Sequence, residues 1–291
     1  MLKLSDIHMR DPLVVPVAKE KTYYLFGSTD TDCWDGPGVG FNCYKSKNLV
    51  DWEGPIRAFT PPKGFWGTKN FWAPEVHAYN GKYYMFASFK AEGVNRGTQI
   101  LSSEKPEGTY LPLTDKPVTP ADWECLDGTL WVEDGEPYIV FCHEWTQIKN
   151  GEVCALKLSK DLKKAVGEPV LLFKAKGVPW VIEHMGGYVT DGPFLYKTKT
   201  GSLLMLWSSI GKEGYAMGIA VSKNGKVLGP WTHEKTALYG KDGGHGMIFK
   251  DFEGQLYFTV HCPNDTPNER PKFIAANEAD GMIKIGPKSK V

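Results

Sequence analysis

The sequence predicts an all-β protein, a five-bladed β-propeller of four-stranded antiparallel blades. A pattern of two short apolar runs joined by a polar turn recurs five times in 291 residues, and no stretch keeps a helical hydrophobic period. Regular self-similarity at 54 to 64 residues is typical of a propeller. The 32 Gly and 20 Pro fit the many tight turns that this fold needs.

The fourth repeat, residues 188–209, shows the pattern most clearly. Asp191-Gly192-Pro193 opens the first apolar run, a polar turn covers residues 197–201, and the second run ends with Leu-Trp-Ser-Ser. Apolar runs bounded by turn residues are typical of a β-hairpin. The same template begins at four other places, which are Arg10, Trp72, Leu126 and His245.

Each hairpin is followed by an alternating run that predicts a third strand and then by a polar turn. Three of these turns lead to an aromatic residue (Trp52, Tyr110 or Trp231) that we expect to cover the edge of the blade. A fourth, outer strand then completes each blade. The clearest candidates for outer strands are residues 56–59, 170–173 and 237–239.

The repeats follow one another without a linker, so we expect residues 1–291 to form a single catalytic domain. Lys and Arg together number 34, as do Asp and Glu, and the net charge of +0 offers no footprint for nucleic acid or an anionic membrane. No apolar run reaches the roughly 18 to 20 residues of a membrane span. The first residues lack the apolar core of a secretory signal, and the six cysteines show no CxxC spacing. We therefore expect a cytoplasmic protein with reduced thiols, and neither nucleic acid nor membrane as a partner.

The first strand of each blade lines the central channel of a propeller, so equivalent residues of different blades meet at one mouth of it. Aligning the five repeats on Asp191 brings together Asp11, Ala73, Asp127, Asp191 and His245. Three carboxylates and an imidazole at one position are hard to explain by packing alone. The alternative interpretation is that Asp-Pro and Asp-Gly only mark the turns before the strands.

Converging carboxylates suit glycoside hydrolysis, in which one carboxyl group stays protonated as an acid and another stays ionised as a base. Mutual repulsion raises the pKa of one member of such a set, which supplies a proton donor at neutral pH. A carboxyl separation of roughly 6.5 to 9.5 Å leaves room for a water molecule and leads to inversion. The aromatic content of 13%, with 10 Trp, fits surfaces on which sugar rings stack.

Five motifs together resemble glycoside hydrolase family 43. They are Asp-Pro at Asp11, Trp-Ala-Pro-Glu at Trp72, Asp-Gly at Asp127, Asp-Gly-Pro at Asp191 and Gly-Gly-His-Gly around His245. The resemblance covers the whole chain and implies a five-bladed propeller that acts as an inverting β-xylosidase, α-L-arabinofuranosidase or arabinanase. It also implies that Asp11 is the general base, that Asp127 orients the acid and tunes its pKa, and that Asp191 is the general acid.

The acid position departs from the family pattern, which usually has Glu-Gly-Pro where this chain has Asp-Gly-Pro. One methylene fewer retracts the carboxyl group by about one C–C bond, and displacements of roughly 1 Å matter in catalysis. Two other carboxyl groups are therefore alternatives to Asp191 as proton donor. Glu183 lies just upstream, and Glu144 closes the second strand of the third repeat.

The family resemblance also implies a structural ion, often calcium, near His245 at the propeller axis. Calcium prefers several oxygen ligands, so a hydrogen-bonded core histidine is an equal alternative, and the chemistry itself requires no cofactor. We expect sugar to contact aromatic rings and polar side chains at the channel mouth. The candidates for substrate binding are Trp34, Trp72, His143, Trp207 and Arg270.

These observations lead to a first hypothesis, an inverting exo-glycosidase that removes terminal α-L-arabinofuranosyl or β-D-xylosyl residues from oligosaccharides of plant polysaccharides. The departure at Asp191 motivates a second one, a non-catalytic carbohydrate-binding propeller that has lost its acid. A third hypothesis, a glycoside phosphorylase, needs a basic cluster beside the acid, and the sequence offers only Arg270 and scattered lysines.

Overall fold

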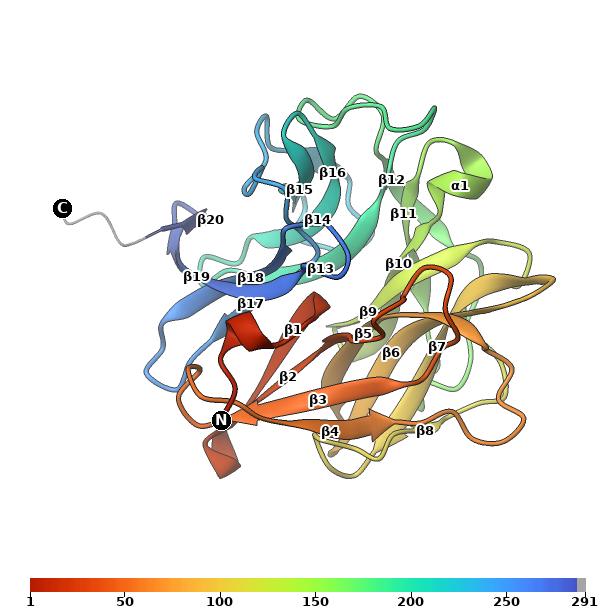
Figure 1. Cartoon of the computed structure of the whole chain (residues 1–291). Coiled ribbons are helices and arrows are strands. Elements are labelled where there is room, and N and C mark those ends of the chain that lie inside the picture. The colour runs from red at the N-terminus through yellow and green to blue at the C-terminus, as the bar shows by residue number, and fades with distance from the viewer. Residues whose placement is uncertain (287–291) are drawn as a thin grey trace.

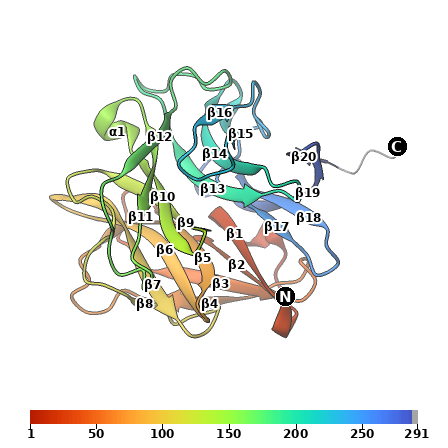
Figure 2. The same cartoon turned by 180° about the vertical axis from the view of Figure 1, so that it is seen from behind.

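The computed structural model describes residues 1–286, and they form five four-stranded antiparallel sheets arranged around one axis (Figures 1 and 2). The fold class is thus confirmed. The first blade contains β1 (Arg10–Val17), β2 (Thr22–Ser28), β3 (Phe41–Ser46) and β4 (Glu53–Phe59). The second contains β5 (Lys69–Tyr79), β6 (Lys82–Ala91), β7 (Val94–Ser103) and β8 (Leu111–Pro112). The third contains β9 (Cys125–Glu133), β10 (Glu136–His143), β11 (Glu152–Lys157) and β12 (Val170–Lys174).

The fourth blade contains β13 (Asp191–Lys197), β14 (Leu203–Gly211), β15 (Gly214–Ser222) and β16 (Trp231–His233). The fifth contains β17 (Ile248–Lys250), β18 (Leu256–Cys262), β19 (Arg270–Ala279) and β20 (Met282–Ile285). Helical structure in residues 1–286 is limited to two short 3₁₀ turns, η1 (Leu4–Asp6) and η2 (Ala18–Glu20), and to the single turn α1 (Trp145–Ile148). In every blade the strands follow in chain order from the innermost to the outermost, which places β1, β5, β9, β13 and β17 around the axis.

One outer strand differs from the prediction. β4 and β12 contain the expected residues, but the outer strand of the fourth blade is β16 rather than residues 237–239. Trp231 opens this strand, and its buried indole donates a hydrogen bond to the carbonyl of Val227 in the preceding turn. The chain therefore pairs as soon as it leaves the turn, and Tyr239 keeps only an isolated bridge to Met217.

Apolar side chains fill the space between neighbouring blades. An aromatic group of Phe41, Phe59, Phe71 and Phe89 joins the first two blades, and Trp207 lies between the third and fourth. All six cysteines are buried, and none forms a disulfide in the described part of the chain. Residues 1–286 contain no helix long and apolar enough to cross a bilayer.

Side-chain contacts, rather than a shared sheet, join the first and last blades. Arg10 on β1 donates to Glu269, with 2.5 Å between Nη1 and Oε1. The Thr259 hydroxyl of β18 donates to the carbonyl of Pro12 at 2.9 Å. The backbone N–H of Asp11 donates to Nδ1 of His261 at 3.1 Å. The ring therefore closes at the place where Asp11 enters the channel.

A left-handed residue lies near the beginning of the innermost strand of every blade, where the strand enters the channel. The φ angles are 56° at Asp11, 46° at Ala73, 56° at Asp127, 52° at Gly192 and 41° at His245. Such angles are uncommon outside glycine and are found at sites where the surrounding structure enforces them. The register of the inner hairpin shifts beside this residue in the first, second, third and fourth blades, as in a β-bulge, which turns a side chain toward the axis.

A hydrogen bond from the neighbouring blade holds most of these turns. The N–H groups of Ala73, Asp127 and His245 donate to serine hydroxyls on the second strand of the preceding blade, at 2.8, 3.0 and 2.8 Å. In the third blade Cys142 occupies the place of that serine. A thiol is a weak acceptor, and the Gly192 N–H instead donates to the carboxylate of Asp127 at 2.9 Å.

These contacts correct the alignment of the fourth repeat by one residue. Gly192, not Asp191, is equivalent to Asp11, Asp127 and His245, because it carries the left-handed angle. Asp191 instead pairs with Ser208 as Arg10 pairs with Ser28. A Cβ atom at Gly192 would lie 2.5 Å from the ring of His245, so the channel has no room for a side chain there.

We expect Gly192→Ala to lower the free energy of unfolding by more than the ~1–2 kcal/mol of a left-handed alanine, because the new methyl group also meets the His245 ring. Gly254→Ala is the matched control, since Gly254 has a φ of 88° and no atom within 4 Å of an added Cβ. Urea unfolding of both variants measures the difference. Equal losses would contradict the placement of Gly192 against His245.

Candidate active site

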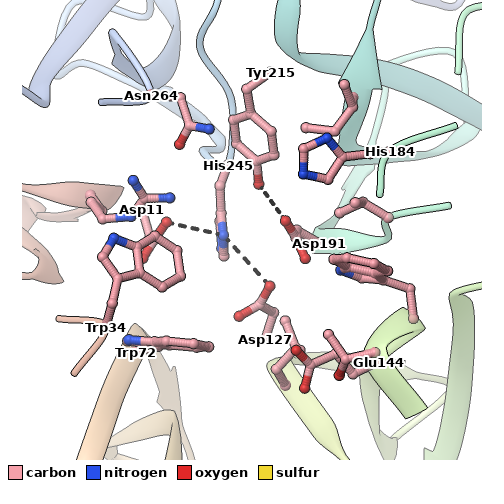
Figure 3. Close-up of a pocket in the computed structure, with 16 residues that line it drawn as sticks. Asp11, Trp34, Trp72, Asp127, Glu144, His184, Asp191, Tyr215, His245 and Asn264 are labelled. Atoms are coloured by element: carbon pink, nitrogen blue, oxygen red, sulfur yellow. Dashed lines mark hydrogen bonds and ion pairs between the residues drawn. The ribbon is translucent and has the colours of Figure 1, made fainter. Parts of the chain in front are cut away.

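A pocket of about 400 Å³ opens where the innermost strands begin, and all five blades contribute to it (Figure 3). Its size is typical of small-molecule sites. Asp11, Asp127 and Asp191 all line the pocket, together with His245. The sequence therefore located the meeting point of these four residues. The other lining residues are Arg10, Trp34, Trp72, Leu126, Glu144, Trp145, Thr146, His184, Val189, Ile210, Tyr215 and Asn264.

Asp11 is held as a carboxylate. Its Oδ2 accepts a hydrogen bond from the Ser28 hydroxyl at 2.6 Å, and its Oδ1 lies 3.2 Å from Nδ1 of His245. Burial alone would raise the pKa of Asp11, but interactions with His245 and Arg10 outweigh it and lower this pKa below its ordinary value. Asp11 is therefore suited to act as a base.

Asp191 has the opposite environment. Burial and the neighbouring carboxylate of Asp127 raise the pKa of Asp191 to about 7. The Tyr215 hydroxyl donates to Oδ2 of Asp191 at 2.9 Å, which partly opposes that rise. Asp191 can therefore hold a proton near neutral pH. Figure 3 shows Asp11 and Asp191 on opposite sides of the His245 ring.

Asp127 contacts both His245, which faces Asp11, and the backbone next to Asp191. Its Oδ2 accepts the backbone N–H of Gly192 at 2.9 Å and lies 3.6 Å from Nδ1 of His245. Burial and the charge of Asp11 raise the pKa of Asp127 well above its usual value, so the Asp127–Asp191 pair favours retention of a proton. The bond to Gly192 fixes the backbone beside Asp191 and thereby orients its side chain.

His245 faces two carboxylates through Nδ1, and its Nε2 is buried without a hydrogen-bond partner in the described part of the chain. That nitrogen is free to contact an ion or a water molecule. Residues 1–286 contain no cluster of three His, Cys, Asp or Glu side chains arranged to bind a metal. The side chains of residues 1–286 therefore do not by themselves offer the several oxygen ligands that calcium prefers. Calcium near His245 stays a prediction.

Two tryptophans form one wall of the pocket. The rings of Trp34 and Trp72 meet edge to face with 5.1 Å between their centroids. The Trp34 indole donates to the Thr266 hydroxyl at 3.1 Å, and the Arg10 guanidinium lies 4.9 Å from the Trp34 ring. The Trp72 indole donates to the carbonyl of Cys33 at 2.7 Å. Both rings are thus fixed and available to a sugar face.

The two alternative acids are placed differently. Glu144 lines the pocket, but its carboxylate is engaged in an ion pair with buried Arg96. Glu183 is exposed, accepts a hydrogen bond from the Tyr188 hydroxyl at 3.3 Å, and does not line the pocket. These placements favour Asp191 over both as the proton donor.

Three of the predicted substrate-binding residues lie outside the pocket. Trp207 is fully buried among Phe173, Trp180 and His233, so its ring is part of the core. His143 stacks on Trp123 at 4.1 Å and interacts with Gln147. Arg270 donates to the backbone carbonyls of Ser5, Pro267 and Glu269.

Sequence reasoning missed several residues that line the pocket. Tyr215 is the second residue of the third strand of its blade and reaches Asp191, whereas His184 and Asn264 come from loops. Arg10 directly precedes Asp11, and this adjacency was the one available signal for it. The sequence contains no signal for Tyr215, His184 or Asn264, because only the assembled ring of blades brings these residues to the pocket.

Comparison with known proteins agrees with this geometry. The model of the glycosyl hydrolases family 43 matches residues 5–279. This chain belongs to glycosyl hydrolases family 43. Among solved structures, the endo-arabinase from Bacteroides thetaiotaomicron is 43% identical, has a TM-score of 0.88, and is matched over 97% of this chain and 98% of its own.

Two curated family 43 relatives are more distant. The extracellular exo-α-(1→5)-L-arabinofuranosidase of Cellvibrio japonicus is 24% identical, over 94% of this chain and 84% of its own length. The extracellular endo-α-(1→5)-L-arabinanase 1 of Bacillus subtilis is 28% identical, over 56% of this chain and 50% of its own length. Both names place those relatives outside the cell, and the cytoplasmic location expected for this chain stays a prediction.

The different placements of two tryptophans can be measured. We expect Trp207→Ala to lower the free energy of unfolding by about 3–5 kcal/mol, because it empties a fully buried site. Trp34→Ala, at a ring that is 47% exposed, should lower it by only about 1 kcal/mol. Urea unfolding distinguishes the two outcomes. A loss at Trp34 as large as at Trp207 would contradict its place on the pocket wall.

Proposed function

We propose that this family 43 protein is an inverting glycosidase that cleaves α-L-arabinofuranosyl linkages in oligosaccharides derived from plant polysaccharides. One observation carries the proposal: three aspartates share one pocket, and their surroundings drive the pKa of Asp11 down and that of Asp191 up. Separated pKa values are what a base and an acid working at the same pH require. The names of the arabinan-directed relatives support the choice of sugar.

In this mechanism Asp11 removes a proton from a water molecule, which attacks the anomeric carbon. Asp191 donates its proton to the departing glycosidic oxygen. Asp127 holds the backbone of Gly192, and repulsion between its carboxyl group and that of Asp191 disfavours ionisation of both, so that the pair keeps a proton. The placement of Asp11 and Asp191 on opposite sides of His245 supports attack by water from the face opposite the leaving group (Figure 3).

The hydroxyl of Tyr215 helps to accommodate an aspartate at the acid position. Because it donates to Oδ2 of Asp191, it fixes the orientation of the shorter side chain. The aspartate is thereby held for proton transfer without the extra methylene of a glutamate. This contact argues against the non-catalytic alternative, which the departure from the family pattern had motivated.

We favour the release of terminal residues over internal cleavage of the polysaccharide chain. The loop that carries Trp34 is tied to the fifth blade through Thr266 and to the second through Asn70, whose amide donates to the Trp34 carbonyl at 2.8 Å. These two hydrogen bonds hold the Trp34 loop in place as a wall on one side of the pocket. Internal cleavage is the second candidate, favoured by the 43% identity to a structure titled an endo-arabinase. Activity on β-D-xylosides stays a prediction.

The first test uses the wild type and Asp11→Asn on linear α-1,5-arabinan, with products separated by chromatography and their anomers followed by proton NMR. We expect β-arabinose as the first-formed product and a loss of about 10²- to 10⁴-fold in kcat for Asp11→Asn. Oligomers appearing before the monosaccharide would favour internal cleavage. Wild-type silence toward arabinan and aryl arabinofuranosides, with sugar binding retained, would sink the hydrolase proposal.

The second test is the pH dependence of kcat/KM. The reaction needs a protonated Asp191, so kcat/KM should fall as the pH rises through about 7. It also needs an ionised Asp11, whose pKa lies below the ordinary 3.8, so on the acid side kcat/KM should fall only when the pH drops below 3.8. Tyr215→Phe removes a donor that lowers the pKa of Asp191, so the upper limb should move to higher pH by roughly one unit while kcat drops.

Tyr188→Phe is the matched control for that shift, because the Tyr188 hydroxyl contacts exposed Glu183 outside the pocket. It should keep the wild-type profile. An upper limb that follows Tyr188 rather than Tyr215 would reassign the acid to Glu183.

A further inference from the structure

A buried arginine lies directly behind the sugar-facing wall. Arg96, near the start of β7, is 6% exposed and does not line the pocket. Its guanidinium lies over the Trp72 ring, with 4.1 Å from Cζ to the ring centroid. At this distance the cation is attracted to the ring face and restricts the ring's rotation.

The same guanidinium holds a carboxylate in the pocket. Its Nη1 donates to Glu144, which lies at the start of α1 in the neighbouring blade, and its Nη2 donates to Oδ1 of Asn70 at 3.2 Å. Figure 3 shows Trp72 and Glu144 on either side of Asp127. Arg96 therefore contacts two pocket residues that come from different blades.

The charges around Arg96 balance locally. Glu124 accepts the backbone N–H of Arg96 at 2.8 Å, lies 3.8 Å from its Nη1, and also pairs with Lys90. Two cations thus face two carboxylates. Buried ion pairs contribute little net stability compared with apolar side chains of the same volume, so stability alone does not account for this cluster.

An aromatic face beside a carboxylate is a combination that suits a sugar, because the ring packs against C–H groups while the carboxylate accepts hydrogen bonds from hydroxyls. We propose that Arg96 is a positioning residue of the active site, which holds the Trp72 ring and the Glu144 carboxylate together as one sugar-binding unit. The ligand is a glycosyl unit with free hydroxyls next to the cleaved bond. This inference rests on the proposed glycosidase function.

A lysine cannot replace Arg96 in this role. The guanidinium is planar, stacks on the indole, and donates in fixed directions to Glu144 and Asn70 at once. A lysine ammonium keeps the positive charge opposite Glu124 and Glu144 but loses the stacking and the fork. Arg96→Lys therefore separates positioning from simple neutralisation of charge.

The test measures kcat and KM on an arabino-oligosaccharide for wild type, Arg96→Lys and the control Lys90→Gln, with thermal unfolding of each. Lys90 belongs to the same charge cluster through Glu124 and does not line the pocket. We expect Arg96→Lys to raise KM about tenfold with little change in kcat, since the stacking on Trp72 and the paired hydrogen bonds to Glu144 and Asn70 are lost. Lys90→Gln should keep the wild-type KM while lowering the unfolding temperature.

Folded Arg96→Lys with the wild-type KM would overturn the inference, as would an equal rise in KM for Lys90→Gln. If Arg96→Lys does not fold, Glu144→Gln tests the same unit from its other partner, and a wild-type KM for Glu144→Gln would overturn it as well. An inactive wild type would instead overturn the proposed function, so the two failures are distinguishable.

Discussion

The structure depends on a left-handed residue near the beginning of each innermost strand. This residue donates its N–H to an acceptor on the preceding blade in the contacts Ala73–Ser28, Asp127–Ser88 and His245–Ser208. Each such bond joins two blades and at the same time directs a side chain toward the axis. A positive φ angle is unfavourable for the non-glycine residues there, and packing between the blades holds them in it. Fold and site are therefore coupled, because the contact that closes the ring also places the carboxylates.

The aspartates in the pocket differ in pKa because their surroundings differ. Asp11 faces His245 and Arg10 and is held ionised, whereas Asp191 faces Asp127 in a buried position and is held nearer to its protonated form. In the proposed mechanism the same side-chain type thus serves as base and as acid. The two side chains also enter the pocket from different backbone positions, because Asp11 is itself the left-handed residue whereas Asp191 directly precedes the left-handed Gly192.

The fold was predictable because five hairpins recur at a nearly constant period, and three pocket carboxylates were predictable because they open those hairpins. The equivalence of Asp191 was wrong by one residue, since a bulge shifts the register without changing the apolar pattern that the sequence displays. Trp207 could not be assigned to the core from the sequence, because the sequence does not show whether an aromatic side chain in a strand points into the core or toward the pocket. Tyr215 and Arg96 reach the site region from the starts of third strands, and only the assembled ring brings them there.

The central claim is that Asp191 holds a proton near neutral pH because burial and the neighbouring Asp127 disfavour its ionised form. The most direct measurement is a carbon-13 NMR titration of aspartate carboxyl groups in the wild type and in Asp191→Asn. The account predicts a carboxyl signal that titrates at about pH 7 in the wild type and is absent from Asp191→Asn. The absence of any aspartate titrating above pH 5, or the persistence of that signal in Asp191→Asn, would contradict it.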